Sequence, residues 1–192
     1  MFGNITSTGT ITFVGGTTPS SMPSTFVNKT TLLTIEAAVL TGKTVEGTGA
    51  ITLSDAVSNG QTFGGITSTG TVTFVGGTTP ASMPSTFVND TTLLTIEASV
   101  LTGKTVSGTG AINLSDAISN DQAFGGITSS GTITFVGGTT PASMPTTFVN
   151  NTTLLTIEAS VLTGKTVSGT GAITLSDAIS NDQTFGGITS TG

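Results

Sequence analysis

The amino-acid sequence predicts an all-β fold, a right-handed parallel β-solenoid (β-helix) with coils of about 20 residues. Three observations support this prediction. The chain repeats every 61 residues, each repeat contains a nine-residue phrase three times, and the last three places of the phrase are apolar, polar and apolar. Such alternation is typical of a strand, because successive side chains point to opposite faces of a sheet. The residues themselves leave the handedness open.

The 61-residue period accounts for the whole chain. The repeats are residues 2–62, 63–123 and 124–184, and residues 185–192 begin a fourth copy. The second and third copies differ at six of their 61 positions. We expect repeats without a linker to form one continuous solenoid. A string of small antiparallel β-sandwiches is the alternative, although an immunoglobulin-like domain needs roughly 100 residues.

Within each repeat, the phrase predicts three stacked strands. In the second repeat the phrases are residues 66–74, 88–96 and 106–114. The seventh places are Val72, Leu94, Ile112 and, at the start of the next repeat, Ile133. These residues are 22, 18 and 21 positions apart, so three coils make up one repeat. We predict that they stack in one column, with the seventh and ninth places facing inward.

Two segments lie outside the phrases. Residues 76–84 contain Pro80 and Pro84, and proline cannot donate a ladder hydrogen bond. We therefore predict a turn or loop that bulges from the first coil and accounts for its 22 residues. Residues 36–40 have helical propensity but are too short for an independent helix.

The composition limits the classes of function. Charged residues make up 7% of the chain, the net charge is −6, and there are 45 Thr but no Cys, His, Trp, Tyr or Arg. Without clustered basic residues we expect no nucleic-acid partner, and no apolar run is long enough for membrane insertion. The absence of Cys excludes disulfides and thiolate metal sites. The recurring Val, Ile, Leu and Phe indicate a folded chain.

The segments "GTITF", "GTVTF" and "GTGAITL", with their Thr and Asn neighbours, resemble β-solenoid passengers of bacterial surface adhesins. These are the filamentous haemagglutinin-like exoproteins and the autotransporter passengers. The resemblance implies a secreted or surface-displayed stalk or filament and transfers no binding residues. Because the chain stops within a copy, we interpret it as part of a longer protein whose export signal lies elsewhere. We expect self-association end to end or side by side, and contact with a glycan or host surface through other regions.

Catalytic chemistry has few candidate residues. Neighbouring coils should bring together three pairs of carboxylates: Glu36 with Asp55, Glu97 with Asp116, and Glu158 with Asp177. Carboxylates about 5 Å apart can hydrolyse a glycoside, as in polysaccharide-cleaving β-helices. These pairs recur three times without an aromatic platform, so we interpret them as solvated acids. We predict no enzyme activity, no cofactor and no metal site.

The recurring lysines could have a chemical or a protective role. They are Lys43, Lys104 and Lys165, each in the segment "LTGKTV". A buried lysine beside Glu and Asn can form an isopeptide cross-link. These lysines follow a turn glycine, so we predict solvated side chains that oppose sideways strand pairing.

The eighth place of the phrase predicts a surface array of threonines. Its members are Thr12, Thr34, Thr52, Thr73, Thr95, Thr134, Thr156 and Thr174, with Asn113 at the remaining place. A regular Thr face resembles ice-binding proteins and could also bind glycans. Ice-binding proteins place their Thr residues two positions apart. Here a second column of Thr, at the fourth place of the phrase and beginning at Thr8, lies four residues before the eighth place. Alternatively, Thr simply suits an exposed strand.

Asparagines provide candidate glycosylation sites. Asn-x-Ser/Thr sequons begin at Asn4, Asn28, Asn89, Asn113, Asn150 and Asn151. Asn28, Asn89 and Asn150 recur at one turn-like place from which a glycan could project. Turn formation by the asparagine is the alternative. The leading functional hypothesis remains a structural stalk, followed by ice or glycan binding and then polysaccharide cleavage.

Overall fold

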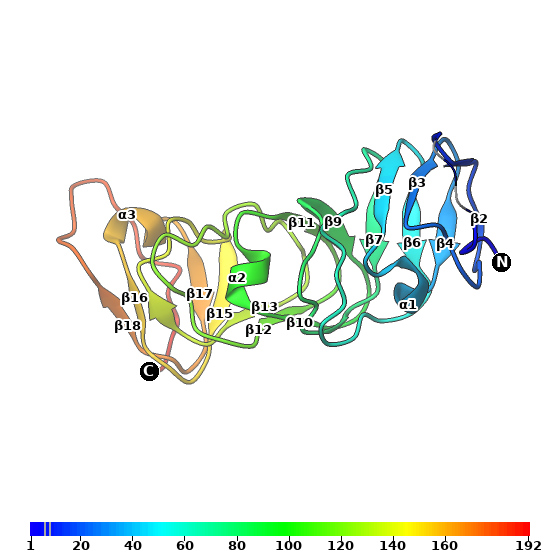
Figure 1. Ribbon diagram of the computed structural model, residues 1–192. Helices are drawn as coiled ribbons and strands as arrows, with labels where there is room; N and C mark the ends of the chain where they lie inside the picture. Colours follow the sequence, from blue (N-terminus) through cyan, green and yellow to red (C-terminus); the bar gives the residue numbers. More distant parts are fainter. Residues whose placement is uncertain (6, 8) are drawn as a thin grey trace.

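The computed structural model describes residues 1–5, 7 and 9–192 and confirms the predicted all-β solenoid, with about 9 turns. The molecule is an elongated rod with its termini at opposite ends (Figure 1). Its short strands lie across the long axis and pair in parallel from coil to coil, as in Thr34 with Thr52 and Thr52 with Thr73. Among the described helices, none is long and apolar enough to cross a membrane.

Within the described residues, each repeat contributes six strands. The first has β1 (Thr12–Phe13), β2 (Gly16–Thr17), β3 (Thr25–Asn28), β4 (Leu33–Ile35), β5 (Thr44–Gly47) and β6 (Ile51–Leu53). The second has β7 (Val72–Phe74), β8 (Gly77–Thr78), β9 (Thr86–Asn89), β10 (Leu94–Ile96), β11 (Thr105–Gly108) and β12 (Ile112–Leu114). The third has β13 (Ile133–Phe135), β14 (Gly138–Thr139), β15 (Thr147–Asn150), β16 (Leu155–Ile157), β17 (Thr166–Ser168) and β18 (Ile173–Leu175).

The segment with helical propensity forms one helical turn in every repeat. These turns are α1 (Ala37–Leu40), α2 (Ala98–Leu101) and α3 (Ala159–Leu162). Ala98 and Leu101 of α2 are buried, whereas Ser99 between them is exposed. The turn therefore forms a corner of the coil that directs two apolar side chains inward.

The hydrogen-bonded sheets run through the boundaries between repeats. One six-stranded sheet has the order β2-β4-β6-β7-β9-β11, and the equivalent next sheet is β8-β10-β12-β13-β15-β17. Partial sheets, β1-β3-β5 and β14-β16-β18, lie at the two ends. Residues 62 and 63 mark a repeat boundary, yet β6 and β7 on either side of it are paired. The second boundary is bridged in the same way by β12 and β13.

The predicted stacking of the seventh places is correct for two steps and wrong for the third. Ile51 pairs with Val72, and Leu94 pairs with Ile112. Leu94, however, lies against Gly77 and not against Val72. The column of stacked seventh-place residues is therefore interrupted once in every repeat, where the next seventh place lies against a glycine of the preceding coil.

The cause of this shift is a short coil formed by the proline-containing segment. Thr73 pairs with Val88, only fifteen residues later, whereas Thr52 pairs with Thr73 after twenty-one residues. Residues 76–84 do not bulge as predicted. They form β8 and a bridge from Ser82 to Thr62, and they bury Met83. Gly76 and Gly77, with φ of 81° and 133°, turn the chain sharply, so that residues 76–84 lie against the preceding coil.

Equivalent elements consequently move around the rod from one repeat to the next. The equivalent strands β4, β10 and β16 belong to three different sheets. Figure 1 shows α1, α2 and α3 at different places around the long axis. Surface features that recur in the sequence therefore face different directions.

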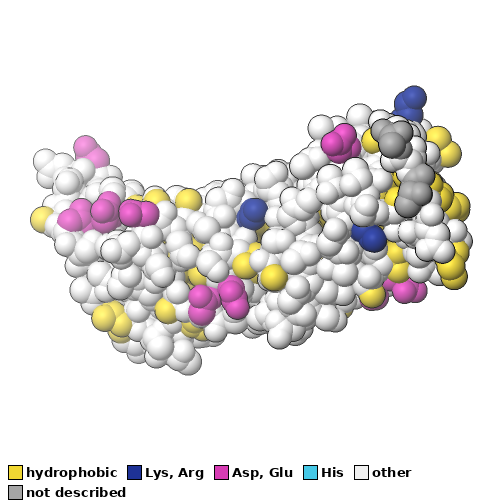
Figure 2. Space-filling view, in the orientation of Figure 1, with side chains coloured by type: hydrophobic (Ala, Val, Ile, Leu, Met, Phe, Trp, Pro, Cys, Tyr) yellow, Lys and Arg dark blue, Asp and Glu magenta, His cyan; other side chains and the backbone are white. Residues whose placement is uncertain are grey.

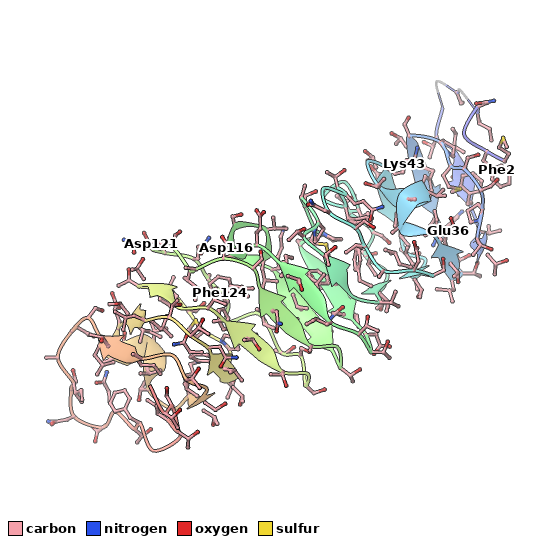
Figure 3. The ribbon with its side chains drawn as sticks, turned by 90° about the horizontal axis from the view of Figure 1, so that it is seen from below. Phe2, Glu36, Lys43, Asp116, Asp121 and Phe124 are labelled. Carbon is pink, nitrogen blue, oxygen red and sulfur yellow. The ribbon has the colours of Figure 1, made fainter. Side chains whose placement is uncertain are left out.

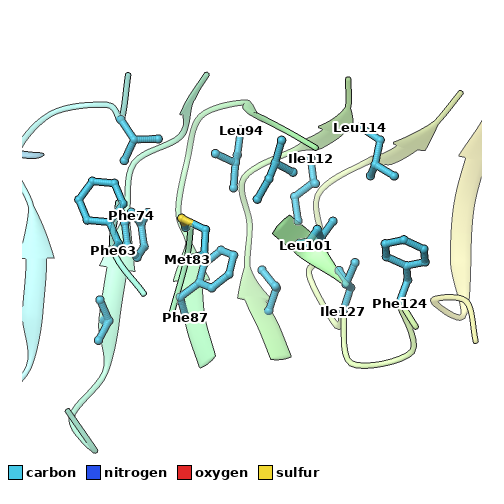
Figure 4. Close-up of a cluster of buried hydrophobic side chains, with 14 of the residues drawn as sticks. Phe63, Phe74, Met83, Phe87, Leu94, Leu101, Ile112, Leu114, Phe124 and Ile127 are labelled. Atoms are coloured by element: carbon cyan, nitrogen blue, oxygen red, sulfur yellow. The ribbon is translucent and has the colours of Figure 1, made fainter. Parts of the chain in front are cut away.

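The core is a continuous column of apolar side chains along the rod. Phe63, Phe74 and Phe87 form an edge-to-face series with ring centroids 5.2 and 5.5 Å apart, and Met83 and Leu101 pack in the same column (Figure 4). The phenylalanines are fully buried, and such burial contributes about 1.5–3 kcal/mol per side chain. The column stabilises all coils together.

Candidate functional site

The predicted carboxylate pairs include an aspartate with a structural role. Asp116 Oδ1 accepts a hydrogen bond of 2.7 Å from the backbone N–H of Ala98, which follows Glu97 on the preceding coil. The equivalent bonds of Asp55 and Asp177 measure 2.7 and 2.6 Å. Neighbouring coils therefore place the aspartate beside the residue that follows the glutamate, and the aspartate caps the first turn of the helix. Among the residues described, no three potential metal ligands lie together.

The recurring lysines are half-buried and not fully solvated. Lys104 Nζ donates a hydrogen bond of 3.1 Å to the carbonyl of Met83, and Lys165 Nζ donates one of 3.0 Å to Met144. Both carbonyls belong to the preceding coil and come directly before a proline. The lysine thus connects two coils through a backbone carbonyl. An isopeptide cross-link instead requires an Asn or Asp side chain as the lysine's partner.

The three asparagines considered as candidate glycosylation sites are buried. Asn28, Asn89 and Asn150 are each 0% exposed. The amide nitrogen of Asn89 donates to the carbonyls of Thr92 and Ala111, at 3.2 and 3.1 Å. A glycan would be attached at this nitrogen, so the folded rod has no space for it. The bond from Asn89 to the carbonyl of Thr92, three residues later, agrees with the alternative of a turn-forming asparagine.

These asparagines instead join the corners of two coils. A Cβ at Gly110 would contact the Asn89 amide, so the backbone of Gly110 approaches this side chain closely. The adjacent Gly108 has a φ of 111° and pairs with Asn89 across the ladder. The Oδ1 atoms of the three asparagines are buried without a hydrogen-bond partner among the residues described. The amide therefore holds two coils together through the two hydrogen bonds that its nitrogen donates, and we call it the asparagine clamp.

The predicted Thr array is divided into three short ladders. Its pairs run Thr17–Thr34–Thr52–Thr73 in the first, Thr78–Thr95–Asn113–Thr134 in the second and Thr139–Thr156–Thr174 in the third. The first two ladders end at a valine, because Thr73 pairs with Val88 and Thr134 with Val149. Thr12 likewise pairs with Val27, and Thr8 lies outside the described residues.

The division of the array separates residues that were predicted to be neighbours. Thr73 and Thr95 belong to different sheets, as do Thr134 and Thr156. Each ladder starts on the next face of the rod, because the coil between Thr73 and Val88 is short. The long flat Thr face that suggested ice binding is therefore absent from the described rod.

The same short coil opens a groove in every repeat. We name these grooves by repeat. The second groove lies between residues 66–72 and residues 84–88, with Ser107 beside it, and has a volume of about 530 Å³. The first groove, with residues 9–11 and 23–27 in its walls, has about 510 Å³, and the third, between residues 129–133 and 147–149, about 450 Å³.

The grooves were not predicted, because the repeated phrase indicates coils that stack directly on one another. The signal was present in the spacing of the chain. The short distance from Thr73 to Val88 leaves the preceding residues 66–71 without a coil directly above them. A spacing of fifteen residues indicates a groove only when it is known that Thr73 pairs with Val88.

The outer surface carries few charges. Figure 2 shows acidic side chains and lysines as isolated groups on a mostly uncharged face. Figure 3 shows Glu36 and Lys43 in the amino-terminal part of the rod, away from Asp116 and Asp121.

No family model, curated protein or solved structure matches this chain.

Proposed function

We propose that the chain is a structural segment of an extracellular or cell-surface fibrous protein. In this function it acts as a stiff spacer whose length increases with the number of repeats. The observation that carries the proposal is the pairing of β6 with β7 and of β12 with β13. Because these ladders cross the boundaries between repeats, adding a repeat extends a rod and does not add a hinge.

Three further observations support a mechanical role. The core continues along the rod, the helix caps and asparagine clamps join successive coils, and the two later repeats are nearly identical. The extracellular location rests on the resemblance of the repeats to adhesin solenoids. Association between copies belongs to the proposal as well, because a coil can stack on a second chain as it stacks on its neighbour.

Arrays of three, six and nine repeats test the spacer function. We expect the maximum dimension from small-angle X-ray scattering to grow linearly, by roughly 14 Å for each added repeat of three coils. The cross-section should stay constant. A matched array with a ten-residue Gly-Ser insert between Thr62 and Phe63 should lose this linear growth. If the uninterrupted array grows no faster than the array with inserts, the spacer proposal is wrong.

A further inference from the structure

We propose that each groove binds an extended, uncharged peptide strand, which adds to the open sheet edges along both walls. The rod would then carry one strand-docking site per repeat, on successive faces. This inference goes beyond the spacer function and does not depend on it. It rests on the backbone groups of the two walls and on the absence of charge.

The first wall of the second groove is paired on one side only. Thr67 and Thr69 donate backbone hydrogen bonds of 2.8 and 2.9 Å to Val45 and Gly47 on the coil below. Backbone groups of successive residues in an extended chain point in opposite directions. The N–H and C=O of Ser68 therefore point into the groove, and neither has a backbone partner among the described residues.

The second wall has an open edge of the same kind. Thr105 donates to the carbonyl of Ser85 at 2.9 Å, so residues 85–87 are joined to β11 above them. The intervening Thr86 turns its N–H and C=O toward the groove. The lower edge of β9 is paired with β7 from Val88 onward, which places the groove directly in line with an existing ladder.

This continuity indicates the kind of strand that fits. The stretch of the β9 edge next to the groove is occupied by β7, whose sequence context is Gly-Thr-Val-Thr-Phe. Both walls run in the same direction, and each offers one backbone donor and one backbone acceptor, at Ser68 and at Thr86. An added strand gains its affinity from such main-chain hydrogen bonds. Small polar and β-branched residues should therefore be favoured in the peptide.

The side chains of the walls favour a peptide over a sugar. Among the described residues, no charged side chain lines the second or third groove, and Glu46 lines only the first. The rings of Phe87 and Phe148 are turned into the core, where each is 1% exposed, so they provide no stacking platform. The groups left for recognition are Ser and Thr hydroxyls, the main chain and half-buried apolar side chains such as Val88.

The probe is the blocked pentapeptide acetyl-Gly-Thr-Ile-Thr-Phe-amide, which copies a segment of the chain itself. Isothermal titration calorimetry of the 192-residue protein should show saturable binding with more than one peptide per chain. A peptide methylated on its Ile and Phe backbone nitrogens should bind at least tenfold more weakly, because it lacks two main-chain donors. Equal binding of the methylated peptide contradicts strand addition.

A groove-filling variant locates the binding site. Thr10, Thr71 and Thr132 are equivalent exposed residues in the walls of the three grooves. The triple variant Thr10→Trp, Thr71→Trp, Thr132→Trp should weaken binding at least tenfold. The matched control is Thr17→Trp, Thr78→Trp, Thr139→Trp, which changes three equivalent exposed positions outside the groove walls. Equal loss in both variants contradicts the groove as the site.

Hydrogen exchange of the unmodified protein gives an independent measurement if a variant fails to fold. The peptide should slow exchange at the amides of Ser68 and Thr86, with no change at Thr67, which is already bonded. Unchanged exchange at a peptide concentration that saturates calorimetry would overturn the proposal. So would binding of cellohexaose that displaces the peptide, because that outcome assigns the groove to a neutral glycan.

Discussion

Two adjacent segments of one coil have opposite relations to their neighbours. β7 pairs with β6 on one side and with β9 on the other. In residues 66–71, directly before it, Thr67 and Thr69 donate backbone hydrogen bonds to the coil below, and no backbone bond to the coil above is found among the described residues. Both segments combine Thr with apolar residues. The difference lies in the following coil, which returns after fifteen residues and covers β7 alone. We call a segment closed when both of its edges are hydrogen-bonded to neighbouring coils, and open when one edge is not. In a solenoid, the length of the next coil decides which of the two a segment is.

The first prediction compares the loss of a core side chain in the closed segment with the loss of a groove-wall side chain in the open segment. Phe74→Ala removes a fully buried ring at the end of β7 and should lower the free energy of unfolding by about 3–5 kcal/mol. Thr71→Ala, in the exposed groove wall, should change it by less than about 0.5 kcal/mol. Urea unfolding followed by circular dichroism measures both. Similar losses for the two variants would show that residues 66–71 are closed as well.

The second prediction concerns the asparagine clamp at the closed end of β9. Asn89→Ala leaves the carbonyls of Thr92 and Ala111 without their side-chain donor and should destabilise the protein by about 1–3 kcal/mol. Asn120→Ala is the control, since Asn120 is exposed and accepts one bond from Thr140. It should cost less than about 0.5 kcal/mol. A neutral Asn89→Ala would mean that this corner is not closed.

The third prediction resolves the two edges amide by amide. In the free protein, Thr67, Thr69 and Val88 should exchange slowly, because their N–H groups lie in ladders. Ser68 and Thr86 should exchange faster, although they are immediate neighbours in the sequence. Hydrogen exchange followed by nuclear magnetic resonance measures this alternation. Uniform protection of residues 67–69 would mean that the groove is closed in solution.

Particular residues show how much of the fold could be predicted. The inward positions Leu33, Ile51 and Val72 do stack, although their coils have 18 and 21 residues, because the period-two pattern directs each of these side chains inward. The pairing of Leu94 with Gly77 could not be predicted, since Gly77 lies outside every phrase. The turn conformations of Gly76 and Gly77 decide that pairing, and they depend on the coils above and below.

The candidate site was less predictable than the fold. Most Thr residues of the ladders were identified individually, but Thr17, Thr78 and Thr139, which begin them, were not. The division into three ladders depends on which strands pair. The burial of Asn89 was missed, because a sequon and a buried clamp have the same local sequence. The groove has no motif of its own. It is an uncovered stretch of backbone, and backbone groups are the same in every sequence.

The sequence by itself determined that the chain repeats, that its strands stack as a solenoid and which side chains face the core. These properties follow from local alternation and from the need to bury apolar area between coils. Only the tertiary structure decided where each coil returns, which edges are paired and which polar side chains are buried. Those outcomes depend on the closure of each coil against its neighbours. The short coil from Thr73 to Val88 therefore sets the rotation of the faces, the break in the Thr array and the groove.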